Sequence, residues 1–142
     1  PSYEDVIYQS TGHAEAVQVE FDPAKVAYEQ LLRVFWFIHD PTQLNRQGND
    51  VGDQYRSVIF YHSDEQRKVA EASRTEETAK HDQPIATVIE PVREFYPAED
   101  YHQQYLTKNP SGYCHVNLGK VEEFVKTLGL SHRLPKSPLI PL

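Results

Sequence analysis

The sequence is poor in sulfur-containing residues. Its 142 residues include no methionine and a single cysteine, Cys114. One cysteine excludes the internal disulfide framework of small secreted domains, and it favours a reducing compartment, for which we predict the cytoplasm. Without methionine there is no initiator residue, and the chain opens on Pro1. We therefore expect a processed product or part of a longer chain.

Long apolar runs and an excess of positive charge are also lacking. No run approaches the ~18 apolar residues of a membrane-spanning helix. The first five residues have neither the basic nor the apolar region of a signal peptide. The formal net charge of −7 disfavours nucleic acid and anionic membranes as partners. The length suits one domain, and 39% hydrophobic residues suffice for a core.

Hydrophobic periodicity predicts strands that alternate with helices. The segment 15–21 alternates apolar and polar residues, which is typical of a half-buried strand. The predicted strands cover residues 15–21, 55–61 and 85–89. The predicted helices cover residues 24–38, 64–80, 98–107 and 121–128, and a loosely held tail is predicted at 134–142. This order predicts an α/β class, as an α+β two-layer sandwich in which helices flank a mixed sheet.

Glu15 is a candidate for acid–base chemistry. It stands at the start of the first predicted strand and shares the parity of Val17 and Val19, so its side chain is expected to face the core. A carboxyl group buried near aromatic rings has a raised pKa and donates a proton at neutral pH. The alternative, a solvent-facing glutamate on a half-buried strand, stays open on spacing alone.

The polar loop 47–57 is a weaker candidate for a metal site. Asp50 and Asp53 do not have the spacing of a calcium loop, and no two-histidine helical motif is present. We therefore interpret the loop as a turn-rich connection and expect no metal.

Two further places allow more than one interpretation. Tyr101 and Tyr105 would share a helical face, and with His102 they are more typical of packing and structural hydrogen bonds than of catalysis. Cys114 precedes a histidine in a glycine-containing loop, which favours a reactive thiol, whereas a lone intracellular cysteine is more often a small buried residue.

Several long segments carry a family resemblance. They are TGHAEAV (residues 11–17), VFW (34–36) with HDPTQ (39–43), RQGND (46–50), QYRS (54–57), FYPAEDYHQQYL (95–106), and KNP (108–110) with GYC (112–114). In this order, from about Pro1 to Leu118, the chain resembles peptide-methionine (S)-S-oxide reductase, the A type of methionine sulfoxide reductase.

The resemblance implies thiol redox chemistry with no bound cofactor or metal. In this family a cysteine thiolate attacks the sulfur of oxidised methionine and becomes a sulfenic acid. A second cysteine then forms a disulfide, which thioredoxin or a small thiol reduces. The implied partners are thioredoxin and proteins or peptides that contain methionine sulfoxide, with free methionine sulfoxide as a further substrate.

The resemblance also assigns residues. Glu15 matches the proton-donating glutamate, and Tyr3 and Tyr55 match the two hydroxyl donors. Asp50 matches the aspartate beside the reactive centre, and Cys114 resembles the resolving cysteine. The assignment agrees with the chemistry, because protonating a sulfoxide oxygen makes its sulfur electrophilic, and such general acid catalysis contributes about 10²–10⁴-fold.

One family motif is missing from the sequence. The nucleophile of the family stands in a Gly-Cys-Phe-Trp motif upstream of the segment that Pro1-Ser2-Tyr3 matches, and the only tryptophan here, Trp36, belongs to another motif. We therefore expect the opening βα unit of the sheet to be missing. The reductase-like domain is predicted at residues 1–118, with an extension at 119–142.

Three hypotheses follow for function. The chain is part of a reductase whose nucleophile segment lies elsewhere and is inactive alone, or it is a non-catalytic module that binds oxidised methionine, or Cys114 acts as a lone nucleophile recycled by small thiols. Because an open sheet edge is a pairing surface, we also expect the chain to be unstable alone or to self-associate.

Overall fold

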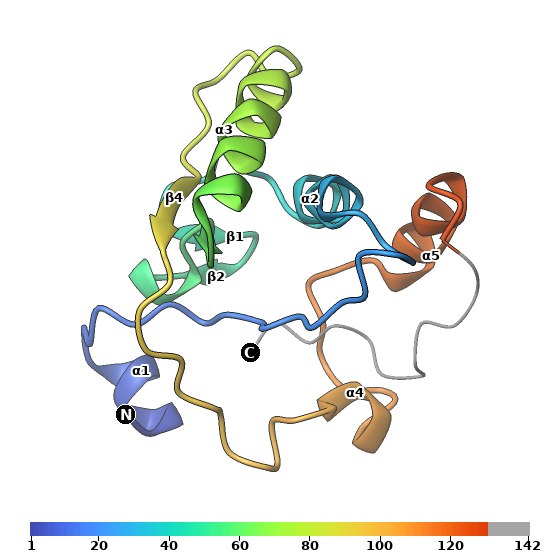
Figure 1. The fold of residues 1–142 in the computed structure, drawn as a ribbon. Helices are drawn as coiled ribbons and strands as arrows, with labels where there is room; N and C mark the ends of the chain where they lie inside the picture. Colours follow the sequence, from blue (N-terminus) through green and yellow to red (C-terminus); the bar gives the residue numbers. More distant parts are fainter. Residues whose placement is uncertain (131–142) are drawn as a thin grey trace.

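A computed structural model describes residues 1–130, so the tail predicted at 134–142 lies outside the described residues. Figure 1 shows the order of the elements along the chain. The helices are α1 (Tyr3–Tyr8), α2 (Tyr28–Ile38), the 3-10 helix η1 (Asp53–Tyr55), α3 (Asp64–Thr78), α4 (Tyr105–Lys108) and α5 (Leu118–Thr127). The strands are β1 (Arg46–Gln47), β2 (Asp50–Val51), β3 (Val58–Tyr61) and β4 (Val88–Pro91). This mixture of helices and small sheets confirms the predicted α/β class.

Two small sheets organise the chain. Strands β3 and β4 pair in parallel, with Val58 opposite Val88, and helix α3 makes the crossover between them. Strands β1 and β2 form an antiparallel hairpin whose turn contains Gly48 in the left-handed region, at φ 58°. The hairpin and η1 precede β3, so the polar loop 47–57 is folded against the start of the parallel pair.

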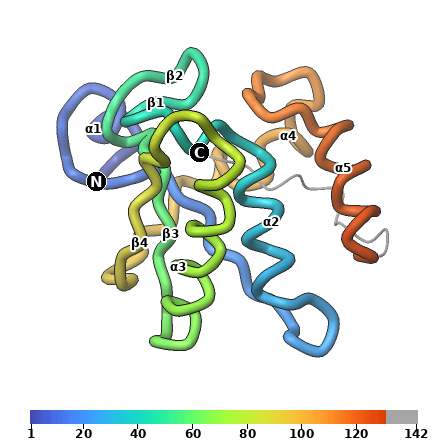
Figure 2. The backbone as a smooth tube through the Cα atoms, turned by 90° about the horizontal axis from the view of Figure 1, so that it is seen from above, coloured from blue at the N-terminus to red at the C-terminus, as the bar shows by residue number. Residues whose placement is uncertain are grey.

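The core lies where α2 and α3 meet the parallel pair, and Figure 2 shows these helices side by side next to β3 and β4. Leu32 and Trp36 of α2 pack with Ile59 and with Ala70, which is 0% exposed. The indole Nε1–H of Trp36 donates to the Ser73 hydroxyl at 2.6 Å, so α2 and α3 are joined by a polar contact as well as by packing.

Helix α5 covers the other side of α2. The rings of Phe37 and Phe124 stack with centroids 4.2 Å apart and planes 4° from parallel. The Gln30 amide donates to the Leu128 carbonyl at 2.8 Å. The helix predicted at 121–128 is therefore present and begins slightly earlier, at Leu118, after the side chain of Asn117 accepts from the Lys120 N–H.

The helix predicted at 64–80 is confirmed as α3, because its start signal is local: the Ser63 hydroxyl accepts from the Gln66 N–H at 3.1 Å. The helix predicted at 24–38 is confirmed over Tyr28–Ile38, and its first residues form a turn on the carbonyl of Asp22. The strand predicted at 55–61 is found as the shorter β3, which ends at the predicted residue, and the strand predicted at 85–89 is found as β4, displaced toward later residues.

Two of the predicted elements are wrong. Residues 15–21 are extended, but they pair with no strand among residues 1–130, and Val17 and Val19 are 44% and 42% exposed. In the helix predicted at 98–107, turns occupy the first part and Gln104 has φ 54°, so the only helix is the short α4. Tyr101 therefore does not share a helical face with Tyr105.

Helix α1 was not predicted. The Ser2 hydroxyl accepts from the Asp5 N–H, and the Asp5 carboxylate accepts from the Ser2 N–H at 2.9 Å, which makes a capping box. Across the described part of the chain, no helix combines the length and the apolar character needed to cross a membrane.

Candidate active site

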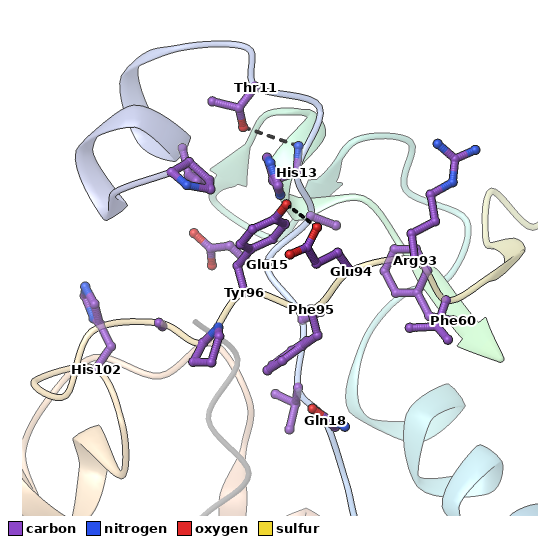
Figure 3. Close-up of a pocket in the computed structure, with 18 of the residues that line it drawn as sticks. Thr11, His13, Glu15, Gln18, Phe60, Arg93, Glu94, Phe95, Tyr96 and His102 are labelled. Atoms are coloured by element: carbon purple, nitrogen blue, oxygen red, sulfur yellow. Dashed lines mark hydrogen bonds between the residues drawn. The ribbon is translucent and has the colours of Figure 1, made fainter. Parts of the chain in front are cut away.

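A broad cavity of about 1110 Å³ separates the N-terminal segments from residues 90–99. Its walls include Tyr3 of α1 and Glu15 of the extended segment. In Figure 3, His13, Glu15 and Tyr96 lie near one another, and His102 stands on a separate stretch of chain. The rings of His13 and Tyr96 meet edge to face at 5.3 Å, so this wall is aromatic where it approaches Glu15.

Glu15 is half-buried and firmly placed. Its backbone N–H donates to the Gln54 carbonyl at 2.9 Å, which ties the extended segment to η1. Burial raises the pKa of its carboxyl group to about 7, and the negative charge of Asp50 adds to that rise. A carboxyl group with this pKa is protonated in a large fraction of molecules at neutral pH and can donate a proton.

Tyr3 and Tyr55 are tyrosines whose hydroxyl groups interact electrostatically with the Glu15 carboxyl group. Burial raises the pKa of both hydroxyls, and the charge of Glu15 raises them further. Both therefore stay protonated near neutral pH. Tyr3 is placed by its backbone N–H, which donates to the Glu99 carboxylate at 2.9 Å, and by the His102 ring, whose centroid lies 4.2 Å away.

Asp50 stands on β2. Its negative charge raises the pKa of Glu15 and of Tyr55. One carboxylate oxygen lies 3.5 Å from Nδ1 of His115, which brings the loop after α4 to the β1–β2 hairpin. Asp50 therefore belongs electrostatically to the cluster formed by Tyr3, Glu15 and Tyr55.

Cys114 is the remaining candidate from the sequence. It is a free, partly buried cysteine, and it precedes the residue that contacts Asp50. Of the five candidates, only Tyr3 and Glu15 line the cavity, whereas Asp50, Tyr55 and Cys114 lie outside its wall. Within residues 1–130, no three histidine, cysteine, aspartate or glutamate side chains are grouped as metal ligands.

The structure gives a place near the site to two residues that the sequence does not assign to it. Arg56 donates through Nη2 to the Gly12 carbonyl at 3.1 Å and through Nη1 to the Asp53 carbonyl at 3.0 Å. Its place in the QYRS motif was a signal, but its partners are distant in sequence. His102, for which the sequence predicts packing and a structural hydrogen bond, packs its ring on Tyr3, and its Nε2 is buried with no hydrogen bond in the described part of the chain.

The cluster has a defined chemical capability. Two protonated hydroxyl groups and one protonatable carboxyl group interact electrostatically, and the charge of Asp50 acts on Glu15 and on Tyr55. Such a set can bind a small acceptor oxygen and transfer a proton to it without a metal. The pKa of the Glu15 carboxyl group is raised to about 7, so this group is suited to proton transfer near neutral pH.

Known proteins resemble this chain over most of its length. The family model described as "Peptide methionine sulfoxide reductase" matches residues 1–131. The peptide methionine sulfoxide reductase MsrA of Methanothermobacter thermautotrophicus is 62% identical over 118 residues, which are 82% of this chain and 70% of the relative. The MsrA of Geobacter sulfurreducens is 57% identical over 116 residues, 80% of this chain and 72% of the relative.

Solved structures also resemble this chain. The reduced form of Mxr1 from Saccharomyces cerevisiae has a TM-score of 0.77 and 47% identity, and the match covers 80% of this chain and 62% of that one. The methionine sulfoxide reductase A of Corynebacterium diphtheriae has a TM-score of 0.70 and 40% identity, and the match covers 80% of this chain and 59% of that one. The chain thus spans less than two thirds of either solved structure.

Proposed function

This chain belongs to the peptide methionine sulfoxide reductase family, and from that premise we propose that its polar cluster binds and protonates the sulfoxide group of oxidised methionine. The proposal rests on Glu15, a half-buried carboxyl group whose pKa is raised to about 7 and whose charge acts on the hydroxyl groups of Tyr3 and Tyr55. A sulfoxide offers only an acceptor oxygen, which suits a site made of donors.

Each member of the cluster has a role in this proposal. Tyr3 and Tyr55 donate hydrogen bonds to the sulfoxide oxygen, and Glu15 transfers a proton to it. Asp50 keeps the Glu15 proton in place, because its charge disfavours a second carboxylate nearby. With the oxygen protonated, the sulfur is electrophilic and open to attack by a thiolate.

The full reaction also needs two thiols. A thiolate attacks the sulfur of the protonated sulfoxide, the S–O bond of the substrate breaks, and the oxygen passes to the cysteine sulfur, which leaves methionine and a cysteine sulfenic acid. A second thiol attacks that sulfur, which releases water and forms a disulfide, so two thiols supply the two electrons. We assign Cys114 as the second, resolving thiol; the family's Gly-Cys-Phe-Trp motif, which carries the first thiol, is not among these 142 residues.

The reductant and the substrate class follow from the family. We propose thioredoxin or a small thiol as the source of electrons for the disulfide, and methionine sulfoxide in proteins or peptides as the substrate. The relatives carry the names of reductases, which does not favour the alternative of a non-catalytic binding module. A cytoplasmic location stays a prediction from the single cysteine.

Calorimetry tests the binding step. We expect the 142-residue chain to bind a methionine sulfoxide peptide at least about tenfold more tightly than the reduced peptide, since one or two hydrogen bonds to the oxygen are worth about 1.4 kcal/mol or more. Tyr3→Phe and Tyr55→Phe should each remove much of that preference. Tyr8→Phe is the matched control, because Tyr8 is on α1 but 82% exposed.

The pH dependence and a turnover assay complete this test. Affinity for the oxidised peptide should fall as the pH rises through about 7, because the Glu15 proton is lost. Equal affinity for both peptides at every pH would contradict the proposal. With dithiothreitol alone we expect no turnover, and turnover that disappears in Cys114→Ser would instead identify Cys114 as the attacking thiol.

A further inference from the structure

Arg56 connects the two pieces of chain that carry Glu15 and Tyr55. One guanidinium nitrogen donates to the Gly12 carbonyl, 44 residues away, and another donates to the Asp53 carbonyl inside η1. The backbone N–H of Arg56 also donates to the Asp53 carbonyl, at 3.2 Å. Arg56 therefore holds the loop before Glu15 against the turn that ends in Tyr55.

A second hydrogen bond joins the two segments that Arg56 connects. The Glu15 N–H donates to the Gln54 carbonyl at 2.9 Å, so the same two segments are joined three residues after Gly12. Gly12 itself has φ 76°, a left-handed conformation that glycine adopts at little cost and that sets the direction of its carbonyl. The two bonds fix both ends of a short loop on the same turn.

The chemistry of the guanidinium suits this position. It is planar and presents its donors as a rigid fork, so a single side chain can reach two carbonyl groups at once, which the single ammonium of lysine does less well. Arg56 also lies in the wall of the cavity, next to the loop that it holds. Burial and the charge of Asp50 raise the pKa of Glu15, and the side-chain hydrogen bonds of Arg56 go to backbone carbonyls, those of Gly12 and Asp53.

We propose that Arg56 is a positioning residue that fixes the Glu15 carboxyl group relative to the Tyr55 hydroxyl by clamping the Gly12 carbonyl onto η1. This inference deepens the proposed function and rests on it for its meaning in the reaction. The clamp itself is a property of the free protein, so it can be tested without any sulfoxide ligand.

The experiment follows the titration of Glu15 in the 142-residue chain by carbon-detected NMR of the glutamate carboxyl groups. In Arg56→Lys the loosened loop admits water, and the titration midpoint of Glu15 should fall by about one pH unit toward its ordinary value. Affinity for a methionine sulfoxide peptide should fall by about tenfold in the same variant. Arg74→Lys is the control, because Arg74 also donates to a backbone carbonyl, that of Thr87, at 3.4 Å and outside the cluster.

The possible results distinguish failure of the clamp from failure of the proposed function. A lowered midpoint in Arg56→Lys but not in Arg74→Lys supports the clamp, even if no variant binds the sulfoxide peptide, which would overturn only the proposed function. An unchanged midpoint and unchanged peptide affinity in Arg56→Lys overturn the clamp.

A measurement on the unaltered chain covers the case in which the variant does not fold. A guanidinium held by two carbonyls should show slow rotation and resolved Nη signals, whereas exposed Arg93, in the same cavity wall, should show averaged signals. Averaged signals for Arg56 as well overturn the clamp.

Discussion

At the scale of single residues, Glu15 links the chemistry of the site to the stability of the chain. Its pKa is about 7 in the folded chain and 4.5 without the folded surroundings. Between these pH values the folded chain binds more protons at this group than the unfolded chain does, so the free energy of unfolding falls as the pH rises. The contribution is fully present below about pH 4.5 and is lost as the pH rises to about 7.

Glu15→Gln isolates the contribution of the Glu15 charge to the free energy of unfolding. The amide stays neutral, so the variant should be more stable than the parent at pH 8 by about 1–3 kcal/mol, and the difference should disappear near pH 4. Urea unfolding at both pH values measures it, with Glu20→Gln, at an exposed position of the same segment, as the control. A stability difference that does not depend on pH would show that Glu15 is not held in an unfavourable environment for its charge.

Single residues also explain why the site could be predicted only in part from the sequence. Glu15 was identified by family resemblance and by its parity with Val17 and Val19, yet those two side chains are exposed, so the parity argument was wrong. The segment that carries Glu15 is held by a bond from its N–H to the Gln54 carbonyl, which is distant in sequence. Arg56 was not identified, because its role depends on a carbonyl group 44 residues away.

At the scale of elements, signals that are local in sequence gave correct predictions. The cap at Ser63 and the apolar stripe of α2 act within a few residues, and both helices are present. Strands depend on a partner, so the alternation at 15–21 predicted extended backbone correctly and a sheet position wrongly. The proline and acidic residues near 97–100 predict a helix, but the left-handed backbone conformation of Gln104 limits α4 to four residues.

A chain of hydrogen bonds, the polar relay, joins the end of α2 to the residues before β3 and before β4. Burial lowers the pKa of His39, so its ring is neutral; Nδ1–H donates to the Phe35 carbonyl at 2.7 Å and Nε2 accepts from the Ser57 hydroxyl at 2.7 Å. The Ser57 oxygen in turn accepts from the Thr87 hydroxyl at 2.7 Å. The relay therefore fixes the end of α2 against the residues that precede β3 and β4, directly beside Tyr55 and Arg56.

Ser57→Ala should show how much the relay stabilises this junction. The change leaves a histidine nitrogen and a threonine hydroxyl buried without their partner, which costs about 1–3 kcal/mol of unfolding free energy. Thermal or urea unfolding at pH 7.5 measures the loss, and Ser10→Ala is the control, since Ser10 is exposed and makes a long 3.4 Å contact. A loss no greater than that of the control would mean that the relay contributes little.

At the scale of the whole molecule, one side of the structure has little secondary-structure support. The parallel sheet has two strands, which is marginal for an independent sheet. The extended segment 16–21 makes no ladder with another strand of residues 1–130, although it borders the large cavity. Exposed apolar side chains lie along the same cavity, including Val17, Phe95 and Tyr96.

This surface predicts self-association of the 142-residue chain. Backbone that pairs with no strand among residues 1–130 and that carries alternating exposed valines is a template for strand pairing between copies. We expect sedimentation velocity to show a larger species that grows with protein concentration. Val19→Lys should shift the equilibrium toward the monomer, because a lysine on an exposed edge opposes pairing by charge repulsion between copies.

Leu44→Lys separates edge pairing from general hydrophobic association. Leu44 is 74% exposed and lies in the turn before β1, away from the extended segment. If edge pairing drives association, this substitution should leave the concentration dependence unchanged, whereas Val19→Lys reduces it. Equal effects of the two substitutions would point to loss of exposed apolar area alone. A monomer at every concentration that also melts cooperatively would contradict the prediction, because the extended segment would then be stable without a pairing partner.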